Sequence, residues 1–287
     1  MLTTADQMLD YLQPLTALDP PEKDIMNQAP DLTIEEARKL QRGLMRRRIE
    51  KGDKMLGYKA GRTNRRILKA ANWTGPAPMV GTLLHSLLRK ETDLIVLDPG
   101  VVTLLEPEVA VVLKRDLVGP GLSNHEVLAA VEGYIPAFEI AVVPPGFVAG
   151  NVSTQHLIAT HKTSGGVVLG STMHSPYGID LRTEGVTLTV DGNVHGTGTA
   201  VEVYGNPLTV VARLADSLAQ DGEYLRAGEI IWTGTICPPA SMTPGGMSPE
   251  NLAAMAVYGS EAFEGHPHYA RADFSRLGSV SLHFAPV

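Results

Sequence analysis

The sequence predicts an α+β protein in which a helical segment, residues 1–54, precedes a large and mostly β catalytic domain, residues 55–287. Helix signals are concentrated before residue 54. From about residue 55 the chain consists of short apolar runs separated by Gly and Pro, a pattern typical of strands and turns. The sequence Asp191-Gly192-Asn193 follows the alternating run 186–190 and predicts a hairpin turn.

Two capping boxes mark helix starts in the first segment. Thr4 is followed three residues later by Gln7, and Thr33 by Glu36, so each pair can satisfy free backbone N–H groups at a helix start. After the second box, apolar residues recur at helical spacing on one face: Ala37, Leu40 and Leu44.

In the second segment, strands are expected at 55–60, 93–97, 103–113, 137–143, 166–170, 186–190, 198–204 and 229–233. Two helices interrupt them. One starts at Ser123, with Glu126 completing a capping box. The other starts at Asn206, with Pro207 at the first helical position. Residues 238–287 are rich in Pro, Gly, Ser and Met, and no element is assigned there.

Composition excludes several classes of partner. The 287 residues carry a net charge of −7, whereas a nucleic-acid-binding surface would be basic. The single cysteine, Cys237, excludes an intrachain disulfide and is typical of a reducing cytoplasm. No signal peptide begins the sequence, and no apolar run approaches the ~20 residues that span a bilayer. We therefore expect a soluble cytoplasmic protein without nucleic-acid or membrane partners.

Three glutamates stand inside apolar, β-prone runs: Glu106, Glu108 and Glu139. Because a strand directs residues i and i+2 to the same face, about 6.6–6.8 Å apart, Glu106 and Glu108 can converge, and Glu139 could join them from a neighbouring strand. Three gathered carboxylates would repel one another unless a divalent cation held them, and all-oxygen ligation favours Mg²⁺, Mn²⁺ or Ca²⁺ over zinc. The alternative is that these strands lie at a sheet edge, with the glutamates facing water.

Lys59 lies between two glycines in the run 57–61, where backbone can approach a ligand closely. Partly buried beside a metal, this lysine could serve as an acid or base near neutral pH; otherwise it is a surface lysine beside a turn. The basic run from Arg62 to Lys69 is either a solvated face or a site for a second substrate carboxylate. The hydroxyl-bearing turn that contains Thr235, and a similar one at Ser164, could receive an anionic group.

Eight segments occur in one order between about residues 30 and 240: Gly57-Tyr-Lys-Ala-Gly-Arg-Thr63, Pro78-Met-Val-Gly-x-Leu83, Glu106-Pro-Glu108, Glu139, Ser164-Gly-Gly-x-Val-Leu-Gly170, Gly196-Thr-Gly-Thr-Ala200, Gly205-Asn-Pro-Leu208 and Gly228-Glu-Ile-Ile-x-Thr-Gly-Thr235. This series resembles the 2-oxopent-4-enoate hydratase and 2-oxo-3-enedioate (4-oxalocrotonate) decarboxylase family, within the fumarylacetoacetase superfamily. Many members carry Asp where this chain has Met79, and Ala-Asp-Asn where it has Ala159-Thr-His161 before Lys162.

The resemblance implies a mixed β-roll, a homo-oligomer and a site that depends on Mg²⁺ or Mn²⁺. By motif position it implies that Glu106, Glu108 and Glu139 bind the metal and that Lys59 is catalytic. Ser164 and Thr235 would then line the site, and Arg62 is a further candidate for binding the substrate.

The expected activity is therefore that of a hydratase, a lyase that adds water to a 2-hydroxy-2,4-dienoate, or a dienedioate, to give a 4-hydroxy-2-oxo acid in meta-cleavage degradation of aromatic compounds. The first alternative is a 2-oxo-3-enedioate decarboxylase. Further alternatives are a C–C bond hydrolase of the same superfamily and a non-catalytic protein that binds 2-oxo acids.

Overall fold

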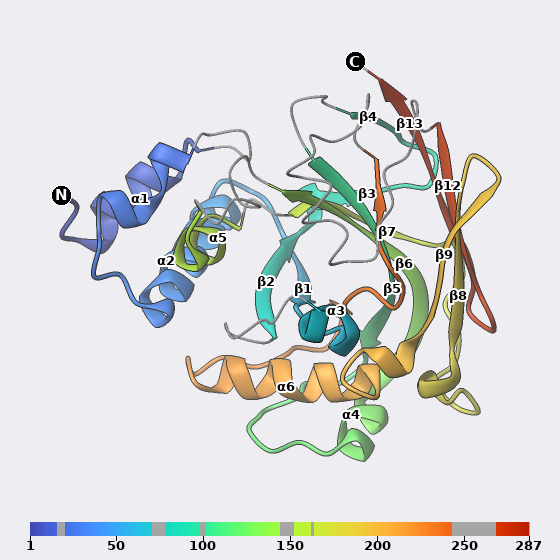
Figure 1. Cartoon of the computed structure of the whole chain (residues 1–287). Helices are drawn as coiled ribbons and strands as arrows, with labels where there is room; N and C mark the ends of the chain where they lie inside the picture. Colours follow the sequence, from blue (N-terminus) through green and yellow to red (C-terminus); the bar gives the residue numbers. More distant parts are fainter. Residues whose placement is uncertain are drawn as a thin grey trace.

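The computed structural model describes residues 1–15, 21–70, 78–97, 102–143, 152–161, 164–242 and 268–286. Two mixed β-sheets and six α-helices in these residues confirm the α+β prediction (Figure 1). The helices are α1 (Ala5–Leu12), α2 (Ile34–Glu50), α3 (Arg65–Ala70), α4 (Asn124–Ala130), α5 (Thr154–Thr160) and α6 (Pro207–Ala219). Within the described ranges, none of these helices is long and apolar enough to cross a membrane.

The larger sheet has eight strands and curls around one apolar face. Seven run in the order β2-β1-β10-β5-β6-β7-β3, and β11 pairs with β5. The pairs β1–β10 and β3–β7 are parallel and the others are antiparallel, so the sheet is mixed. Its strands are β1 (Met55–Gly61), β2 (Met79–Leu84), β3 (Leu88–Arg89), β5 (Val102–Leu113), β6 (Val131–Val143), β7 (Ser164–Leu169), β10 (Ile230–Trp232) and β11 (Ala240–Ser241).

The smaller sheet has five strands in the order β4-β13-β12-β8-β9 and lies on the side away from the N-terminal helices (Figure 1). Its strands are β4 (Leu94–Leu97), β8 (Gly185–Val190), β9 (Asn193–Thr199), β12 (Tyr269–Phe274) and β13 (Gly278–Pro286). Buried side chains of both sheets, including Leu105, Phe138, Leu188 and Val280, form one hydrophobic cluster. Burial of this apolar surface holds the two sheets face to face.

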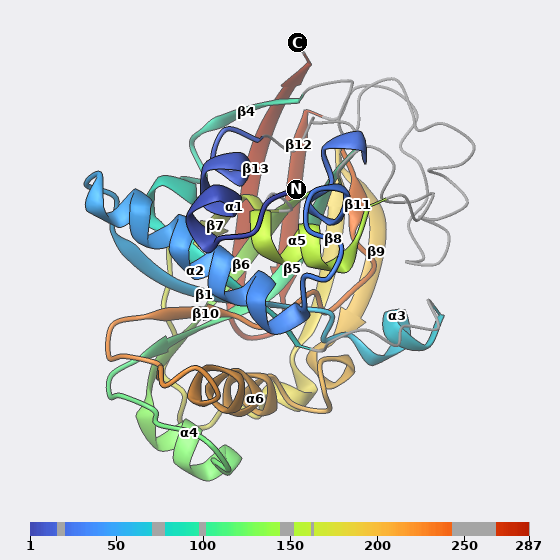
Figure 2. The ribbon, with the colours of Figure 1, turned by 90° about the vertical axis from the view of Figure 1, so that its left-hand side faces the viewer.

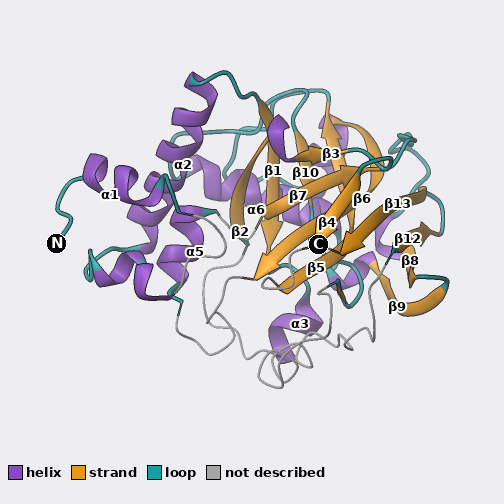
Figure 3. Cartoon of the chain, turned by 90° about the horizontal axis from the view of Figure 1, so that it is seen from above, coloured by secondary structure: helices purple, strands orange, loops and turns teal. Residues whose placement is uncertain are grey.

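The N-terminal helices pack on the opposite side of the larger sheet, beside α5 (Figures 2 and 3). Both expected capping boxes are present, at Thr4 and at Thr33. Leu40 and Leu44 of α2 form a second hydrophobic cluster with Leu84 of β2 and Ile158 of α5. This cluster crosses residue 54, so the division into residues 1–54 and 55–287 stays a prediction.

One buried side chain connects these three elements. The Gln41 amide, which is 5% exposed, donates to the Ile158 carbonyl at 2.7 Å and to the Val80 carbonyl at 3.3 Å. Gln41 belongs to α2, Val80 to β2 and Ile158 to α5. A buried amide that satisfies two backbone carbonyls fixes the positions of the segments that carry them.

Most of the expected elements occur, with differences that have local causes. The helices after Ser123 and Asn206 and the hairpin at Asp191 are confirmed. The strand expected at 198–204 is wrong: β9 ends at Thr199, and Ala200–Glu202 form a 3₁₀ turn. The run 200–204 is β-prone, but Ala200 and Val203 turn inward to the core. Strands β12 and β13 occupy part of the region that was left without elements.

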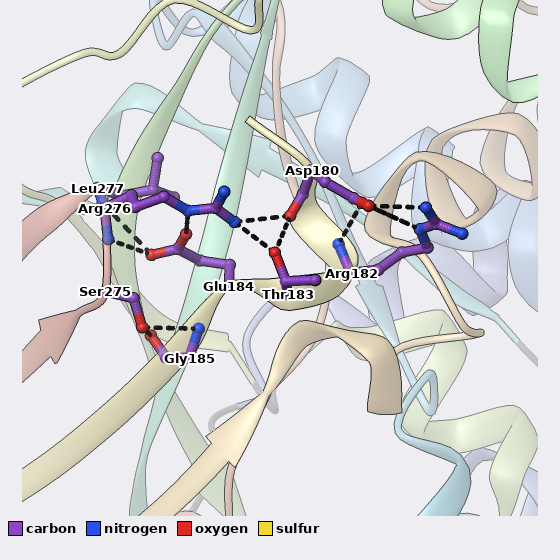
Figure 4. Close-up of polar contacts among 8 residues, drawn as sticks. All are labelled: Asp180, Arg182, Thr183, Glu184, Gly185, Ser275, Arg276 and Leu277. Atoms are coloured by element: carbon purple, nitrogen blue, oxygen red, sulfur yellow. Dashed lines mark hydrogen bonds and ion pairs between the residues drawn. The ribbon is translucent and has the colours of Figure 1, made fainter. Parts of the chain in front are cut away.

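An ion pair between buried Glu184 and exposed Arg276 lies beside the smaller sheet (Figure 4). The Glu184 side chain is fully buried and accepts hydrogen bonds from the backbone N–H and the Nε–H of Arg276, at 2.8 and 3.1 Å. The Leu277 N–H donates to the same carboxylate at 3.3 Å. These bonds tie the turn between β12 and β13 to the segment that precedes β8, so the interior carboxylate has several donors.

Candidate functional site

The three glutamates singled out from the sequence lie together in the larger sheet. Glu106 of β5 is the direct partner of Glu139 on β6, and Glu108 lies two residues along β5 on the same face. One carboxylate oxygen from each lies within 4.8 Å of the others. Both strands are interior to the sheet, and Glu108 and Glu139 are only 1% and 3% exposed, so the interpretation of water-facing edge glutamates is wrong.

The face that carries these carboxylates is otherwise apolar. Ala110, Ala137 and Trp232 form a small hydrophobic cluster on it. Ala110 lies two residues from Glu108 and Ala137 two residues from Glu139. Because strands alternate, these alanines share the face of the carboxylates, which therefore lie beside a buried apolar surface. In such a setting charged groups interact strongly, because little water screens them.

Burial and mutual repulsion control the ionisation of the cluster. Burial, reinforced by the charge of Glu139, raises the pKa of Glu106 to about 7. Burial also raises the pKa of Glu108 well above its ordinary value, and the charges of Glu139 and Glu106 add to this effect. The backbone N–H of Gly234 donates to Glu108 Oε2 at 2.7 Å and opposes the shift.

A hard divalent cation fits this set of donors. The second oxygen of Glu108, Oε1, is buried and has no hydrogen-bond partner among the described residues. A buried acceptor without a partner is costly, and three oxygens that converge from separate carboxylates are the ligands that Mg²⁺ and Mn²⁺ prefer. Glu106, Glu108 and Glu139 are therefore the residues of this chain that could hold such an ion.

Lys59 joins the cluster from a third strand. Strand β1 directs Tyr58 and Ala60 into the core between the sheets, so Lys59, between them, points to the carboxylate face. Its Nζ forms a buried ion pair with Glu139, and the lysine is 9% exposed. Lys59 is also the register partner of Trp232 on β10. The structure thus places an ammonium group next to the acidic cluster.

The other candidate residues surround this centre to different degrees. Arg62 directly follows β1 and is partly exposed, and its charge acts to lower the pKa of Glu106. The remaining basic side chains of the run, on α3, are exposed: Arg65, Arg66 and Lys69. A second carboxylate-binding site on this run stays a prediction.

The two hydroxyl residues differ in their contacts. Ser164 begins β7 opposite Ala141, and its Oγ is buried with no partner in the part of the chain that the structure describes. The Thr235 hydroxyl donates to the Cys237 carbonyl at 2.7 Å, so it closes its own turn. The anionic group that this turn binds is the Glu108 carboxylate, which accepts a hydrogen bond from the Gly234 N–H. Roles of Ser164 and Thr235 in binding substrate stay predictions.

Cys237 has no sign of nucleophilic activation. It is 2% exposed, and burial together with the charge of Glu106 raises the pKa of its thiol to about 12. A thiol that keeps its proton at neutral pH is a poor nucleophile. It fills space beside the centre.

Sequence reasoning missed two residues next to Lys59. Gly81 of β2 is the register partner of Lys59, and His161 at the end of α5 lies against Gly81. The sequence signal for His161 is its place in the stretch that departs from the resembled family pattern. Lys162, the next residue in that stretch, lies outside the described residues. Met79, the other departure from the family pattern, packs against the second hydrophobic cluster, which contains Leu40 and Leu44 of α2.

The family description "Fumarylacetoacetate (FAA) hydrolase C-terminal" matches residues 58–258, which include Lys59 and all three glutamates. The chain belongs to this family. It is 32% identical to 4-oxalocrotonate decarboxylase of Pseudomonas putida, over 77% of this chain and 82% of the relative. It is also 32% identical to 2-keto-4-pentenoate hydratase of Paraburkholderia xenovorans (strain LB400), over 75% and 79%.

Solved structures give the same fumarylacetoacetate hydrolase fold. The structure of 4-oxalocrotonate decarboxylase from Pseudomonas putida G7, complexed with magnesium and adipate, superposes with a TM-score of 0.79 at 26% identity. The match covers 99% of each chain. The resemblance drawn from the eight motifs, and with it the predicted fold class, is confirmed.

Proposed function

We propose that this protein is a divalent-metal-dependent hydratase that adds water to a 2-hydroxy-2,4-dienoate to give a 4-hydroxy-2-oxo acid. The observation that carries the proposal is the convergence of Glu106, Glu108 and Glu139 beside Lys59 on an otherwise apolar face of the sheet. The hydratase relatives at 32% identity support the reaction class, and a place in aromatic catabolism is proposed for this chain.

The three glutamates would hold Mg²⁺ or Mn²⁺. When bound, such an ion supplies a Lewis acid that stabilises negative charge developing on a 2-oxo acid. Mg²⁺ is supported by the magnesium complex of the structural neighbour at 26% identity. The carboxylates of Glu106 and Glu108, whose pKa values are raised, would have to lose their protons for binding, so metal loading and proton release are coupled.

Lys59 is the proposed proton carrier. Hydration of a dienol requires a proton to move from the 2-hydroxyl to a carbon of the chain before water adds to the conjugated alkene. The Nζ of Lys59 is paired with Glu139 and so faces the place where the substrate oxygens would lie. A buried lysine beside an acidic cluster can exchange a proton with a substrate at that point. Arg62, Ser164 and Thr235 are proposed to line the substrate pocket.

The second candidate is a 2-oxo-3-enedioate decarboxylase, which would lose CO₂ where the hydratase adds water. It is favoured by the 4-oxalocrotonate decarboxylase relative and by the structural match across 99% of both chains. Both reactions need a site that stabilises the same dienolate charge. The acidic centre therefore supports either reaction, and product analysis must separate them.

The deciding experiment incubates the protein with 2-hydroxy-2,4-dienoates and 2-oxo-3-enedioates, in the presence of Mg²⁺ or Mn²⁺, and identifies the products. A 4-hydroxy-2-oxo acid supports the hydratase, and CO₂ from an enedioate supports the decarboxylase. Cleavage of a C–C bond with uptake of water would make it a hydrolase. If calorimetry shows that a 2-oxo acid binds but no product forms, the protein is a non-catalytic protein that binds 2-oxo acids. Full rates after chelation of metal would exclude the metal-dependent proposal.

We further propose that the protein forms a homo-oligomer. Edge strand β4 presents Leu94 and Val96 on one face, 60% and 62% exposed. Apolar side chains on an exposed edge strand are a common place for association between copies. Light scattering coupled to gel filtration tests this, because a monomer has a mass of 30.7 kDa. Charged substitutions at Leu94 and Val96 should then reduce the measured mass.

A further inference from the structure

His161 occupies a backbone conformation that residues other than glycine seldom adopt. It ends α5 in the left-handed region, at φ 52° and ψ 24°, and is 7% exposed. Its N–H donates to the Leu157 carbonyl at 3.2 Å and closes the last helical turn. Gly or Asn is the usual residue at a helix end of this kind. A residue other than glycine kept at such a buried position points to a task for its side chain.

The His161 ring lies beside the Lys59 side chain. Strand register places Gly81 directly opposite Lys59. A Cβ atom added to Gly81 would lie 2.9 Å from His161 Nδ1 and 2.9 Å from Lys59 Cγ, closer than real Cβ contacts. The imidazole ring and the aliphatic part of the lysine therefore border the same small space. Gly81 is required there because any side chain would displace one of them.

The position of His161 is fixed through its helix. The buried Gln41 amide donates to the carbonyl of Ile158, three residues before His161, and to that of Val80, next to Gly81. At the other end of α5, His156 Nδ1 accepts a hydrogen bond from the Ile25 N–H at 3.1 Å. With both ends of α5 attached, the ring of His161 has little freedom to move away from Lys59.

His161 also forms part of the wall of a cavity. The cavity has a volume of about 390 Å³ and lies between α1, α2 and β7. Its cationic side chains come from the end of α2: Arg47, Arg48 and Lys51. Among the described residues Lys59 does not line this cavity, whereas His161 does. His161 therefore borders both this cavity and the small space beside Gly81 that the Lys59 side chain also borders.

We propose that His161 is a positioning residue that keeps the Lys59 side chain between the imidazole ring and Glu139 and shields it from the cavity. A lysine has four rotatable side-chain bonds, so a wall on one side and an ion-pair partner on the other restrict it to few rotamers. The expected effect of His161 on turnover rests on the proposed function. The shielding of Lys59 is independent of that function and can be measured without a substrate.

The first test uses the chemical reactivity of Lys59 and no substrate. An amine-acylating reagent is applied to wild type, His161→Ala and His161→Asn, and peptide mass spectrometry follows the labelling of Lys59 relative to exposed Lys114. Labelling of Lys59 should be severalfold faster in His161→Ala, with Asn intermediate because its smaller side chain tolerates the left-handed backbone. His125→Ala, at an exposed position of α4, should leave the ratio unchanged. An unchanged ratio in both His161 variants, with native circular dichroism, would overturn the inference.

The second test separates positioning from folding. In His161→Ala, kcat should fall about tenfold with little change in KM or in metal affinity, because the proton carrier is misplaced while the binding groups stay. Gly81→Ala should cost less in His161→Ala than in the wild type, because the contact of the added methyl group with the ring is then absent and only its contact with Lys59 Cγ remains. Additive losses, or a loss of metal affinity equal to the loss of kcat, would contradict a positioning role. If His161→Ala fails to fold, His161→Asn carries both tests.

The failures can be told apart. Absence of turnover by the wild type with every dienoate and enedioate would remove the proposed function, and the labelling ratio would still decide the inference about His161. Normal kcat in a folded His161→Ala protein whose Lys59 is labelled faster would show that shielding occurs without a role in turnover, and would overturn the positioning role.

Discussion

Glu106 and Glu139 lie directly opposite each other across the β5–β6 pair, and with Glu108 they bring three carboxylates within 4.8 Å. Like charges in this arrangement oppose one another, and the apolar face beneath them adds a cost of burial. The sheet register itself therefore creates a site that favours protons or a cation.

Glu108→Gln should abolish most of the turnover while it stabilises the metal-free protein. Glutamine keeps an acceptor for the Gly234 N–H but removes one of the three charges. We expect loss of at least about 100-fold in kcat/KM, or about 3 kcal/mol, together with a higher Tm in chelator. Glu132→Gln, at an exposed position of β6, is the matched control. Wild-type turnover in Glu108→Gln would contradict the metal role of this residue.

The stability of the metal-free protein should depend on pH through Glu106. Burial and the charge of Glu139 raise the pKa of Glu106 from 4.5 to about 7, so the folded state binds this proton more tightly than the unfolded chain. The resulting stabilisation is complete below about pH 4.5 and is lost as pH rises through about 7. Urea unfolding at several pH values in chelator measures it. Glu106→Gln should flatten the curve over this range, and an unchanged slope would argue against the shift.

Metal binding should release protons and weaken in acid. Because Glu106 and Glu108 must be ionised to bind a cation, affinity for Mg²⁺ or Mn²⁺ should fall as pH drops below about 7. Calorimetry in two buffers with different heats of ionisation gives the number of protons released. Proton release close to zero at neutral pH would mean that the carboxylates are already ionised without metal.

Lys59→Met should separate binding from chemistry. The substitution keeps the apolar stem of the side chain and removes the ammonium group that pairs with Glu139. Turnover should be lost, and metal affinity should rise, because a competing positive charge has been removed from the acidic cluster. Calorimetry and steady-state kinetics on the same preparation check both effects. Lys114→Met, at an exposed site, should change neither.

Glu184→Ala should destabilise the smaller sheet without a direct effect on the metal centre. Its buried carboxylate accepts from Arg276 and Leu277, and its loss leaves these donors without their acceptor. We expect a decrease of about 2 kcal/mol in the free energy of unfolding, because backbone N–H groups lose their acceptor while the remaining charge of Arg276 is exposed. Glu35→Ala, in an exposed ion pair with Lys39, should cause no measurable change. Equal effects of the two substitutions would show that burial of Glu184 is unimportant.

Local signals in the sequence account for much of the fold and for the centre of the site. The capping boxes at Thr4, Thr33 and Ser123 mark helix starts because their hydrogen bonds lie within four residues. Glu106 and Glu108 could be recognised because strand alternation is local and carboxylates are rare in apolar runs. Their arrangement with Glu139 needed only the antiparallel pairing of two strongly β-prone segments.

Features that depend on distant contacts were not accessible in this way. The smaller sheet joins β8 to strands about 80 residues later, and the Glu184–Arg276 pair spans a similar distance. Strand β9 contains Gly196 and Gly198, which weaken a strand signal, and only pairing with β8 makes it a strand. His161 beside Lys59 follows from the packing of α5, which no local pattern in residues 154–160 specifies.

The Gln41 amide makes the first fifty residues a working part of the enzyme proposed here. A chain shortened to begin at Met55 would lose the donor that anchors Ile158 and the apolar cover of Leu84. The sheets could persist in such a fragment while α5, and the imidazole it carries, drifted from the lysine. Removal of the amino-terminal helices would thus lower the turnover rate even where the remaining protein keeps its fold.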